Sequence, residues 1–488
     1  MIKNQSLRFF GITLAIMGLV PTAVFSGDEV VAGWERSYKA GVTDRNGQYM
    51  GGSELMHLVG HKGMLFASNG YWQDSRNTWY GGKDKSTGWA QVLRLDKPGG
   101  QWEVDLEMGL RHLRGETLQS ITFTTNSKGE LLKDPVNLLF ASAYKPNQLT
   151  LEVTLYTRDD ATGKWVTSTI YTGPNTIDNE DRSVRAICVH RDKVTGIDHL
   201  FISIGKLGIF SGVYDASIPS KILWEKDSES GPVETRPLAM IEAGGDLLFS
   251  AGRKIYRRND GTSPSYTVVY DISDLYSGAV VQADGGIRGL TAIPCPSGKG
   301  ESLLFAVSEG GSARGAIYRL DPTKEGRYTR VCEVYLDQLM SKYLNGNPVH
   351  FVLPAYNDLH PVVDPATNET VHLIGFESWI SGHRFPLWGE NKEGGFYAGG
   401  MYAIRDKNGH YRLKEVNGRS TPSKPSLVSI RAIATSPFKG HEGEIVYFGG
   451  HDGNMKPSHN MAWIFSTSCK NALQIDGPET SVGTAVHP

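Results

Sequence analysis

Arginines recur at one place in a repeated pattern of this 488-residue chain. Four short alternating segments, each predicted as a β-strand, have an arginine at their start: Arg185, Arg236, Arg288 and Arg431. Guanidinium groups bind carboxylates and sulfates through a planar, two-pronged set of donors. A fold that gathers these strand starts would form a cationic ring for an anionic ligand. A repeat can equally copy structural arginines that hydrogen-bond carbonyl groups of the neighbouring unit.

Three long predicted loops combine aromatic with polar side chains. They span residues 68–82, 377–389 and 449–460. Aromatic faces beside fixed polar groups suit sugar rings, which are apolar on their faces and polar at their edges. We therefore predict that Trp72, Asp74 and Trp379 bind substrate together with the four arginines. The alternative is that these aromatic side chains only pack the loops against one another.

Histidine and tyrosine side chains near these loops could transfer protons. We predict catalytic roles for Tyr71, His360, His383, His451 and His459. Tyr356 and His112 are further candidates. We expect His360 at the start of the innermost strand of its unit, where the second unit has Gln119 and the first has Ser53 or Glu54.

A metal site must be weighed at the same loops. His451, Asp452 and His459 share one loop and His383 could lie opposite, but the spacing matches no zinc or calcium signature. No GxSxG, HExxH, Walker or dinucleotide-binding motif stands in a suitable context, and no CxxCH haem attachment is present. The cofactor content is therefore left open, with a divalent metal as the one candidate.

An internal repeat predicts the framework that holds these residues. Six stretches share an apolar run that closes on an aromatic or aliphatic residue, followed by small residues. They are Met64–Ser68, Leu138–Ser142, Leu200–Ser203, Leu247–Ser250, Leu303–Ala306 and Val446–Gly449, and His372–Gly375 is a weaker seventh copy. Their spacing suits units of four short strands with variable loops. We therefore predict an all-β fold, a seven-bladed β-propeller with four-stranded blades.

The expected units begin near residues 53, 118, 183, 236, 286, 350 and 429. The strand near residues 31–40 should pair into the last blade and close the ring between the two chain ends, which limits exposed sheet edges. Helical periodicity is scarce, with one short helix expected over residues 337–343. A two-sheet sandwich is the rival architecture, but it needs fewer strands than this repeat implies.

The N-terminus is predicted to be a targeting segment. Lys3 and Arg8 precede an apolar run over residues 9–25, and small residues lead to Gly27, which is typical of a signal peptide over residues 1–26. The propeller would then span residues 27–470, followed by a C-terminal tail over 471–488. We expect a secreted or periplasmic protein without stable membrane insertion after cleavage; the alternative, an uncleaved anchor, has a short apolar stretch.

Composition excludes some partners and leaves the thiols open. The chain has 50 basic and 52 acidic residues, which gives no sign of a nucleic-acid partner. The four cysteines are far apart in sequence and form no CxxC motif. Cys188 is expected to be buried, and Cys295 and Cys332 are the nearest pair if export permits a disulfide.

Two classes of function fit these residues. The first is an enzyme that degrades an acidic, uronate-containing or sulfated polysaccharide, most concretely as a lyase in which arginines neutralise a uronate carboxylate while a histidine removes the adjacent proton. A glycosidase would instead use two carboxyl groups, for which Asp74, Glu377 and Asp452 are available. The second class is a non-catalytic propeller that binds a glycan or a protein. A redox propeller with a bound cofactor is a more distant third.

The architecture over residues 30–468 resembles exported bacterial β-propellers, some of which are polysaccharide lyases or glycosidases. The resemblance covers the repeat alone, because no catalytic motif matches residue by residue. No regular Asp-box, WD or kelch signature is present either. It implies a carbohydrate-active propeller, which is an analogy of fold.

Overall fold

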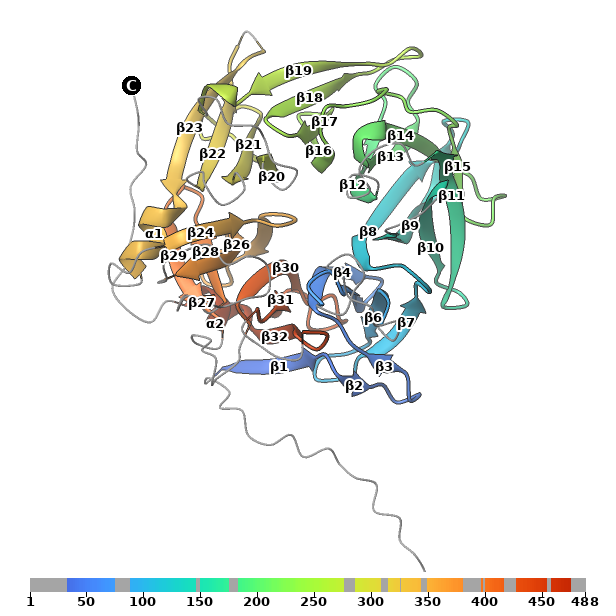
Figure 1. Cartoon of the computed structure of the whole chain (residues 1–488). Helices are drawn as coiled ribbons and strands as arrows, with labels where there is room; N and C mark the ends of the chain where they lie inside the picture. The colour runs from blue at the N-terminus through green and yellow to red at the C-terminus, as the bar shows by residue number, and fades with distance from the viewer. Residues whose placement is uncertain are drawn as a thin grey trace, which may run out of the picture.

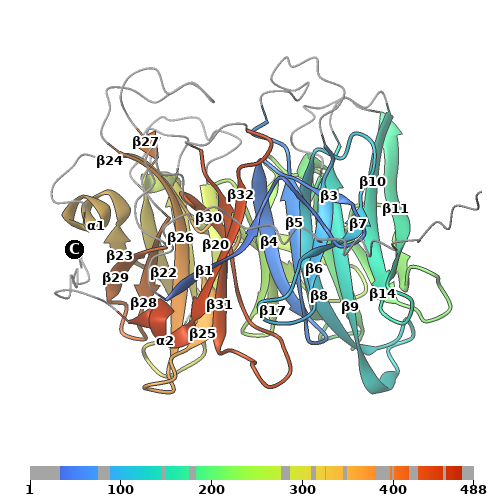
Figure 2. The same ribbon diagram turned by 90° about the horizontal axis from the view of Figure 1, so that it is seen from below.

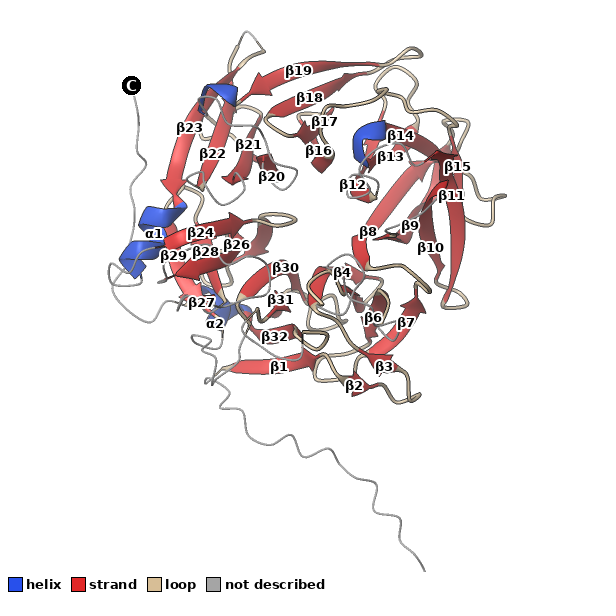
Figure 3. Ribbon diagram, in the orientation of Figure 1, coloured by secondary structure: helices blue, strands red, loops and turns tan. Residues whose placement is uncertain are grey.

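The computed structural model describes residues 33–74, 88–145, 150–174, 183–275, 286–308, 315–324, 326–343, 349–380, 396–397, 400–416, 427–453 and 458–474. Antiparallel β-sheets make up nearly all of its regular structure (Figure 3). The sheets are arranged around a common axis (Figure 1), and from the side they stand next to one another (Figure 2). The predicted all-β class is confirmed, with curled sheets arranged as in a propeller.

Three sheets have four strands each, in chain order from the axis outward. The first contains β12 (Val184–Arg191), β13 (Asp198–Ile204), β14 (Gly208–Tyr214) and β15 (Ile222–Trp224). The second contains β16 (Pro237–Ala243), β17 (Asp246–Ala251), β18 (Lys254–Asn259) and β19 (Ser265–Asp271). The third contains β20 (Gly286–Pro294), β21 (Glu301–Ser308), β22 (Ala316–Pro322) and β23 (Tyr328–Tyr335).

A larger, eight-stranded sheet precedes them. It contains β4 (Glu54–His61), β5 (Met64–Gly70), β6 (Gln91–Leu95), β7 (Glu103–Glu107), β8 (Arg114–Thr125), β9 (Leu131–Tyr144), β10 (Thr150–Asp159) and β11 (Lys164–Pro174). One pairing, Gly70 with Arg114, joins the set β4–β7 to the set β8–β11. The small hairpin of β2 (Val42–Thr43) and β3 (Tyr49–Met50) lies before this sheet in the chain.

A ten-stranded sheet joins the two ends of the described chain. It contains β24 (Val349–Pro354), β25 (His360–Val363), β26 (Thr370–Ile380), β27 (Phe396–Tyr397), β28 (Met401–Arg405), β29 (Tyr411–Glu415), β30 (Ser429–Thr435), β31 (Ile445–His451), β32 (Ala462–Ser468) and β1 (Trp34–Lys39). The N-terminal strand β1 pairs antiparallel with β32, as the sequence indicates. The expected short helix is α1 (Leu336–Tyr343), and α2 (Cys469–Leu473) follows β32.

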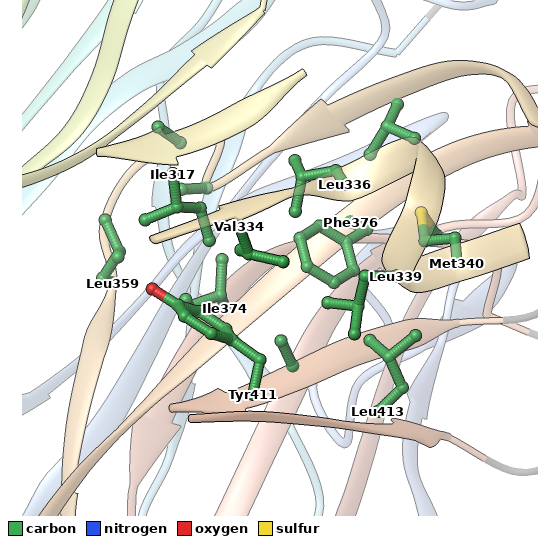
Figure 4. Packing of buried hydrophobic residues seen from close by; sticks show 14 of the residues in the cluster. Ile317, Val334, Leu336, Leu339, Met340, Leu359, Ile374, Phe376, Tyr411 and Leu413 are labelled. Atoms are coloured by element: carbon green, nitrogen blue, oxygen red, sulfur yellow. The ribbon is translucent and has the colours of Figure 1, made fainter. Parts of the chain in front are cut away.

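The repeated apolar stretches are central strands of these sheets. They lie in β5, β9, β13, β17, β21, β26 and β31, where the aromatic side chains are fully buried, as at Phe66, Phe140 and Phe305. A strand covered on both faces is apolar throughout, whereas a strand with one face in water alternates. Figure 4 shows such packing between β22, β23 and α1 on one side and β26 and β29 on the other.

Buried charge networks join neighbouring sets of strands. Arg158 of β10 binds Asp105 of β7, and Arg258 of β18 binds Asp192, which follows β12. In the third network the Glu333 carboxylate in β23 accepts hydrogen bonds from Arg405 of β28 and from Arg319 of β22. Each pair is removed from water, so the charges must compensate one another.

The expected disulfide between Cys295 and Cys332 is not formed, because all four cysteines are free thiols. Cys295 follows β20 and Cys332 lies in β23, which are the two opposite edges of one four-stranded sheet. Three strand spacings separate these edges, about 14 Å in all, and a disulfide requires Cα atoms less than about 7 Å apart. Cys188 is half-buried rather than buried.

We expect an alkylating reagent to modify all four thiols when the protein is denatured without reductant. Mass spectrometry of the alkylated protein measures this directly, with a reduced sample as the control. Two alkylated cysteines in place of four would show a disulfide and contradict the placement of Cys295 and Cys332.

No helix among the described residues is long and apolar enough to cross a lipid bilayer. The predicted signal peptide over residues 1–26 and nearly all of the predicted tail over 471–488 lie outside the described residues. Their roles stay predictions.

Candidate functional site at the propeller axis

One loop occupies the axis of the ring. Strands β24 and β25 both pair with β26, and the residues between them, 355–359, leave the sheet. We call residues 355–359 the axial loop. Its ends, Ala355 and Leu359, are buried in the core shown in Figure 4, whereas Tyr356 is half-buried. Tyr356 is thereby presented to the arginines at the starts of the surrounding strands.

Five buried arginines gather at these strand starts, and we call them the arginine ring. Its members are Arg114, Arg185, Arg236, Arg288 and Arg431. The guanidinium carbons of Arg431, Arg185 and Arg288 lie 4.3, 4.7 and 5.0 Å from the centre of the Tyr356 ring. These are cation–π distances. Arg236 and Arg114 both interact electrostatically with Arg185. The structure therefore brings together the four arginines that the sequence placed at strand starts, and adds Arg114.

Three buried glutamates balance part of this charge. Glu116 pairs with Arg114 and lies 3.7 Å from Arg185. Arg431 binds two carboxylates, that of Glu54 and that of Glu377, the latter at 3.1 Å. Among the described residues, three glutamates thus lie beside the arginine ring.

The charges alter proton affinities in the site. Burial disfavours ionisation of the Tyr356 hydroxyl, but Arg114, Arg431, Arg185 and Arg288 outweigh burial and lower its pKa below the ordinary value of 10.0. Burial likewise opposes ionisation of Glu116 and Glu377, and neighbouring arginines again lower both pKa values. Both carboxyl groups are therefore ionised at neutral pH, and Tyr356 is a stronger acid than an ordinary phenol.

His451 closes one side of the site at the end of β31. It is 1% exposed, and its Nδ1 atom has no hydrogen-bond partner among the described residues. Burial first, and then Arg431, lower its pKa to about 3 against the opposing effect of Glu377. The imidazole is consequently neutral at physiological pH. It could accept a hydrogen bond from a ligand but would not act as a cationic acid.

The predicted residues of the first loop divide into two groups. Trp72 is half-buried, and the Arg114 guanidinium lies 4.7 Å from the centre of its ring, so it borders the arginine ring. Tyr71 is only 1% exposed and packs with Leu113 and Tyr144. Asp74 is fully buried and accepts a hydrogen bond from Ser458, which ties two loops together.

The remaining predicted residues lie in varied surroundings. His360 begins β25 directly after the axial loop, and its Nδ1 atom lies 3.8 Å from the Asp358 carboxylate. The axial loop divides the innermost strand of this unit into β24 and β25. The start of the innermost strand is therefore the start of β24, and His360 does not hold the expected position. His459 is half-buried, and its carbonyl oxygen accepts a hydrogen bond from the Gly52 amide. Trp379 lies in β26, and His383 lies outside the described residues.

The second unit also begins earlier than expected. Strand β8 starts at Arg114, so Arg114 and Glu116 hold the position that had been expected for Gln119, which instead lines a cavity of about 220 Å³ with His57 and Asp358. Arginine and glutamate two residues apart in a strand point to the same face. That spacing is the signal that could have identified Glu116. At the first unit, the start is Glu54, one of the two residues expected there.

In the part of the chain that the structure describes, no three histidine, cysteine, aspartate or glutamate side chains are grouped as metal ligands. His451 and Asp452 are both buried, and His459 is half-buried beside the same loop. His383, the fourth residue of the predicted metal site, lies outside the described residues, so the metal stays a prediction.

Comparison with known proteins gives a structural likeness without a family. No protein-family model and no curated sequence matches the chain. A GH93 α-L-arabinofuranosidase of Fusarium graminearum with arabinobiose is 10% identical, with a TM-score of 0.42 and coverage of 89% of this chain and 97% of that one. The same enzyme with an iminosugar inhibitor gives 10% identity, a TM-score of 0.43 and coverage of 92% and 100%.

A protein of unknown function from Dyadobacter fermentans is also similar, at 10% identity, with a TM-score of 0.37 and coverage of 90% and 100%. The prediction that the protein is a lyase is wrong, because the enzymes named among these structural neighbours are glycoside hydrolases. The broader expectation of a glycan-degrading propeller holds only at that coarse level. No residue role is transferred from these proteins.

Proposed function

We propose that this protein hydrolyses glycosidic bonds in an anionic polysaccharide at the arginine ring. The observation that carries the proposal is the placement of the Tyr356 side chain among three guanidinium groups within 5.0 Å of its ring, with buried carboxylates beside them. Perturbed titratable groups gathered in one place favour an active site over a purely structural charge network.

The arginine ring favours an anionic substrate. Guanidinium groups suit a uronate carboxylate or a sulfate group, because they bind either with two parallel hydrogen bonds. Trp72, beside Arg114, offers an aromatic face on which a sugar ring can stack. A substrate of this class fits the site better than a neutral sugar.

The chemistry follows from the proton affinities. Tyr356 donates its phenolic proton to the glycosidic oxygen as that bond breaks, and the arginines stabilise the phenolate that forms. A carboxylate removes a proton from the attacking water. Glu54 suits this role because its Oε1 atom is buried without a hydrogen-bond partner among the described residues. Solvent then returns the proton from the carboxyl group to Tyr356.

A second candidate function is binding without catalysis. It is favoured by the ion pairs of Glu54, Glu116 and Glu377, which already satisfy part of the arginine ring. A binding protein would retain polysaccharide and release no reducing ends. Release of reducing ends from polygalacturonate or a sulfated galactan, with neutral arabinan as the control, therefore separates the two functions.

We also propose the finer architecture. Seven sets of strands support seven four-stranded blades, with β24 and β25 counted as the two halves of one strand. The sets are β4–β7, β8–β11, β12–β15, β16–β19, β20–β23, then β24, β25, β26, β28 and β29, and finally β30, β31, β32 and β1. Pairing of β1 with β32 supports closure of the ring. Export of the mature chain, secreted or periplasmic, rests on the N-terminal sequence.

Replacement of Arg288 by alanine should weaken binding of polygalacturonate by at least about tenfold, since a hydrogen bond to a charged group contributes about 1.5–3 kcal/mol. Binding should also lose part of its salt dependence. Isothermal titration calorimetry at two salt concentrations measures both effects. Arg330→Ala is the matched control, because Arg330 lies on the outer strand β23 and pairs there with Asp274. Equal affinity in wild type and Arg288→Ala would remove the arginine ring from the binding site.

A further inference from the structure

The axial loop is held by sheets on several sides of the ring. It belongs to the strand pair β24 and β25, yet Asn357 contacts β4 and β30, and Arg185 reaches it from β12. On a further side, Gly289 of β20 has a φ of 59°, and a Cβ atom there would lie 2.8 Å from the Cβ of Ala355 and 2.5 Å from Leu359. Only glycine allows this approach. The loop is thus enclosed by strands from separate sheets.

Asn357 uses both ends of its side-chain amide in this position. Its Nδ2 group donates to the carbonyl oxygen of Met56 in β4 and, at 2.9 Å, to that of Arg431 in β30. Its Oδ1 atom accepts a hydrogen bond of 3.0 Å from Arg185. Arg185 also donates to the Tyr356 carbonyl oxygen at 3.2 Å. The three bonds of its side chain tie Asn357, the residue after Tyr356, to strands that carry or adjoin the arginine ring.

We propose that Asn357 is a positioning residue, which fixes the Tyr356 ring on the propeller axis among the arginines. Three strands determine its place, so the amide acts as a common anchor for one side chain that no single sheet could hold. Because a displacement of about 1 Å in a reacting group can cost about a hundredfold in rate, Asn357 controls catalysis without touching the substrate. The effect of Asn357 on activity rests on the proposed function, whereas its effect on the titration of Tyr356 does not.

The test replaces Asn357 by alanine and follows ionisation of Tyr356 by ultraviolet difference spectroscopy, with Tyr356→Phe as the blank that identifies its signal. We expect Asn357→Ala to move the titration of Tyr356 upward towards an ordinary tyrosine, because the ring leaves the guanidinium groups. Asn357→Ser, which places a hydroxyl group where the amide was, should give an intermediate shift. This variant replaces Asn357→Ala in the test if the alanine variant does not fold. Asn259→Ala is the control, since Asn259 bonds Ser265 at an exposed site.

Activity provides the second readout. On an anionic polysaccharide, Asn357→Ala should lower kcat about a hundredfold with a much smaller change in KM, and the alkaline limb of the pH profile should move upward with the titration. An unchanged Tyr356 titration in both folded variants would overturn the positioning role. If the titration of Tyr356 shifts in the variants but the wild type has no hydrolytic activity, the positioning role holds and the proposed function is refuted.

Discussion

Phenylalanine in place of Tyr356 should lower kcat/KM on an anionic polysaccharide by at least about a hundredfold. The substitution removes the phenolic proton that the proposed mechanism delivers to the leaving oxygen, while the ring can stay between the guanidinium groups. Binding should therefore change little, and the loss should fall on kcat. Initial rates of reducing-end release over a range of substrate concentrations measure both constants.

The pH profile gives the same substitution a distinctive signature. The protonated phenol is the active form, and the arginines lower its pKa from the ordinary value of 10.0. Activity of the wild type should thus fall at a pH below 10, and this alkaline limb should vanish from the residual activity of Tyr356→Phe. Tyr447→Phe is the control, because Tyr447 is buried and packs in the core near Phe438, away from the arginine ring. Equal rates for wild type and Tyr356→Phe would exclude Tyr356 as the acid.

Glutamine in place of Glu333 should destabilise the protein by about 3–5 kcal/mol, the usual cost of leaving a buried charge without its partner. The fully buried carboxylate accepts hydrogen bonds from Arg405 at 2.6 and 2.7 Å, from Arg319 at 2.5 Å and from Tyr411 at 2.6 Å. These bonds join the sheet of β20–β23 to β28 and β29. Denaturant unfolding followed by tryptophan fluorescence measures the difference.

The effect should depend on pH with a definite sign. Burial raises the pKa of Glu333, but Arg405, Tyr411 and Arg319 outweigh burial and lower it below the ordinary value of 4.5. A lowered pKa gives stability that is present above about pH 4.5 and is lost as the pH falls through the lower folded-state value. The two proteins should therefore converge in stability in acid.

Glu369→Gln is the control for this ion pair. Glu369 pairs with Lys407 at the surface, where both side chains are exposed, so its loss should cost less than about 1 kcal/mol. A cost for Glu333→Gln as small as that for Glu369→Gln would contradict the buried network.

The framework could be predicted because the sequence repeat reflects a packing requirement of each central strand. A central strand covered on both faces needs an apolar run ending in small residues, and seven such runs locate β5, β9, β13, β17, β21, β26 and β31. The arginines at 185, 236, 288 and 431 also came together as their equivalent positions indicated. Their role in binding stays a prediction.

The centre of the site could be predicted only in part. Tyr356 was one of several proton-transfer candidates, but nothing local shows that residues 355–359 leave their strand and cross to the axis. That displacement depends on Gly289 in β20 and on Asn357 bonding Met56 and Arg431, contacts between segments far apart in the chain. It also removed His360 from the expected strand start.

Other expectations failed because of geometry between strands. A disulfide between Cys295 and Cys332 looked plausible from their separation in sequence, yet the two positions lie at opposite edges of one sheet. Sequence distance within a four-stranded antiparallel unit is a poor guide to spatial distance, since the chain moves outward by one strand at each turn. The recurring Arg-x-Asp pairs at Arg94, Arg158, Arg258 and Arg319 were a readable signal for the charge networks.

The most direct measurement is mass spectrometry of the products formed from polygalacturonate or a sulfated galactan in water enriched in heavy oxygen. Hydrolysis at the arginine ring predicts products that carry one heavy oxygen atom at the new reducing end, formed by wild type and not by Tyr356→Phe. Unsaturated products without the label, or no products at all despite tight retention of the polysaccharide, would contradict the proposed hydrolysis.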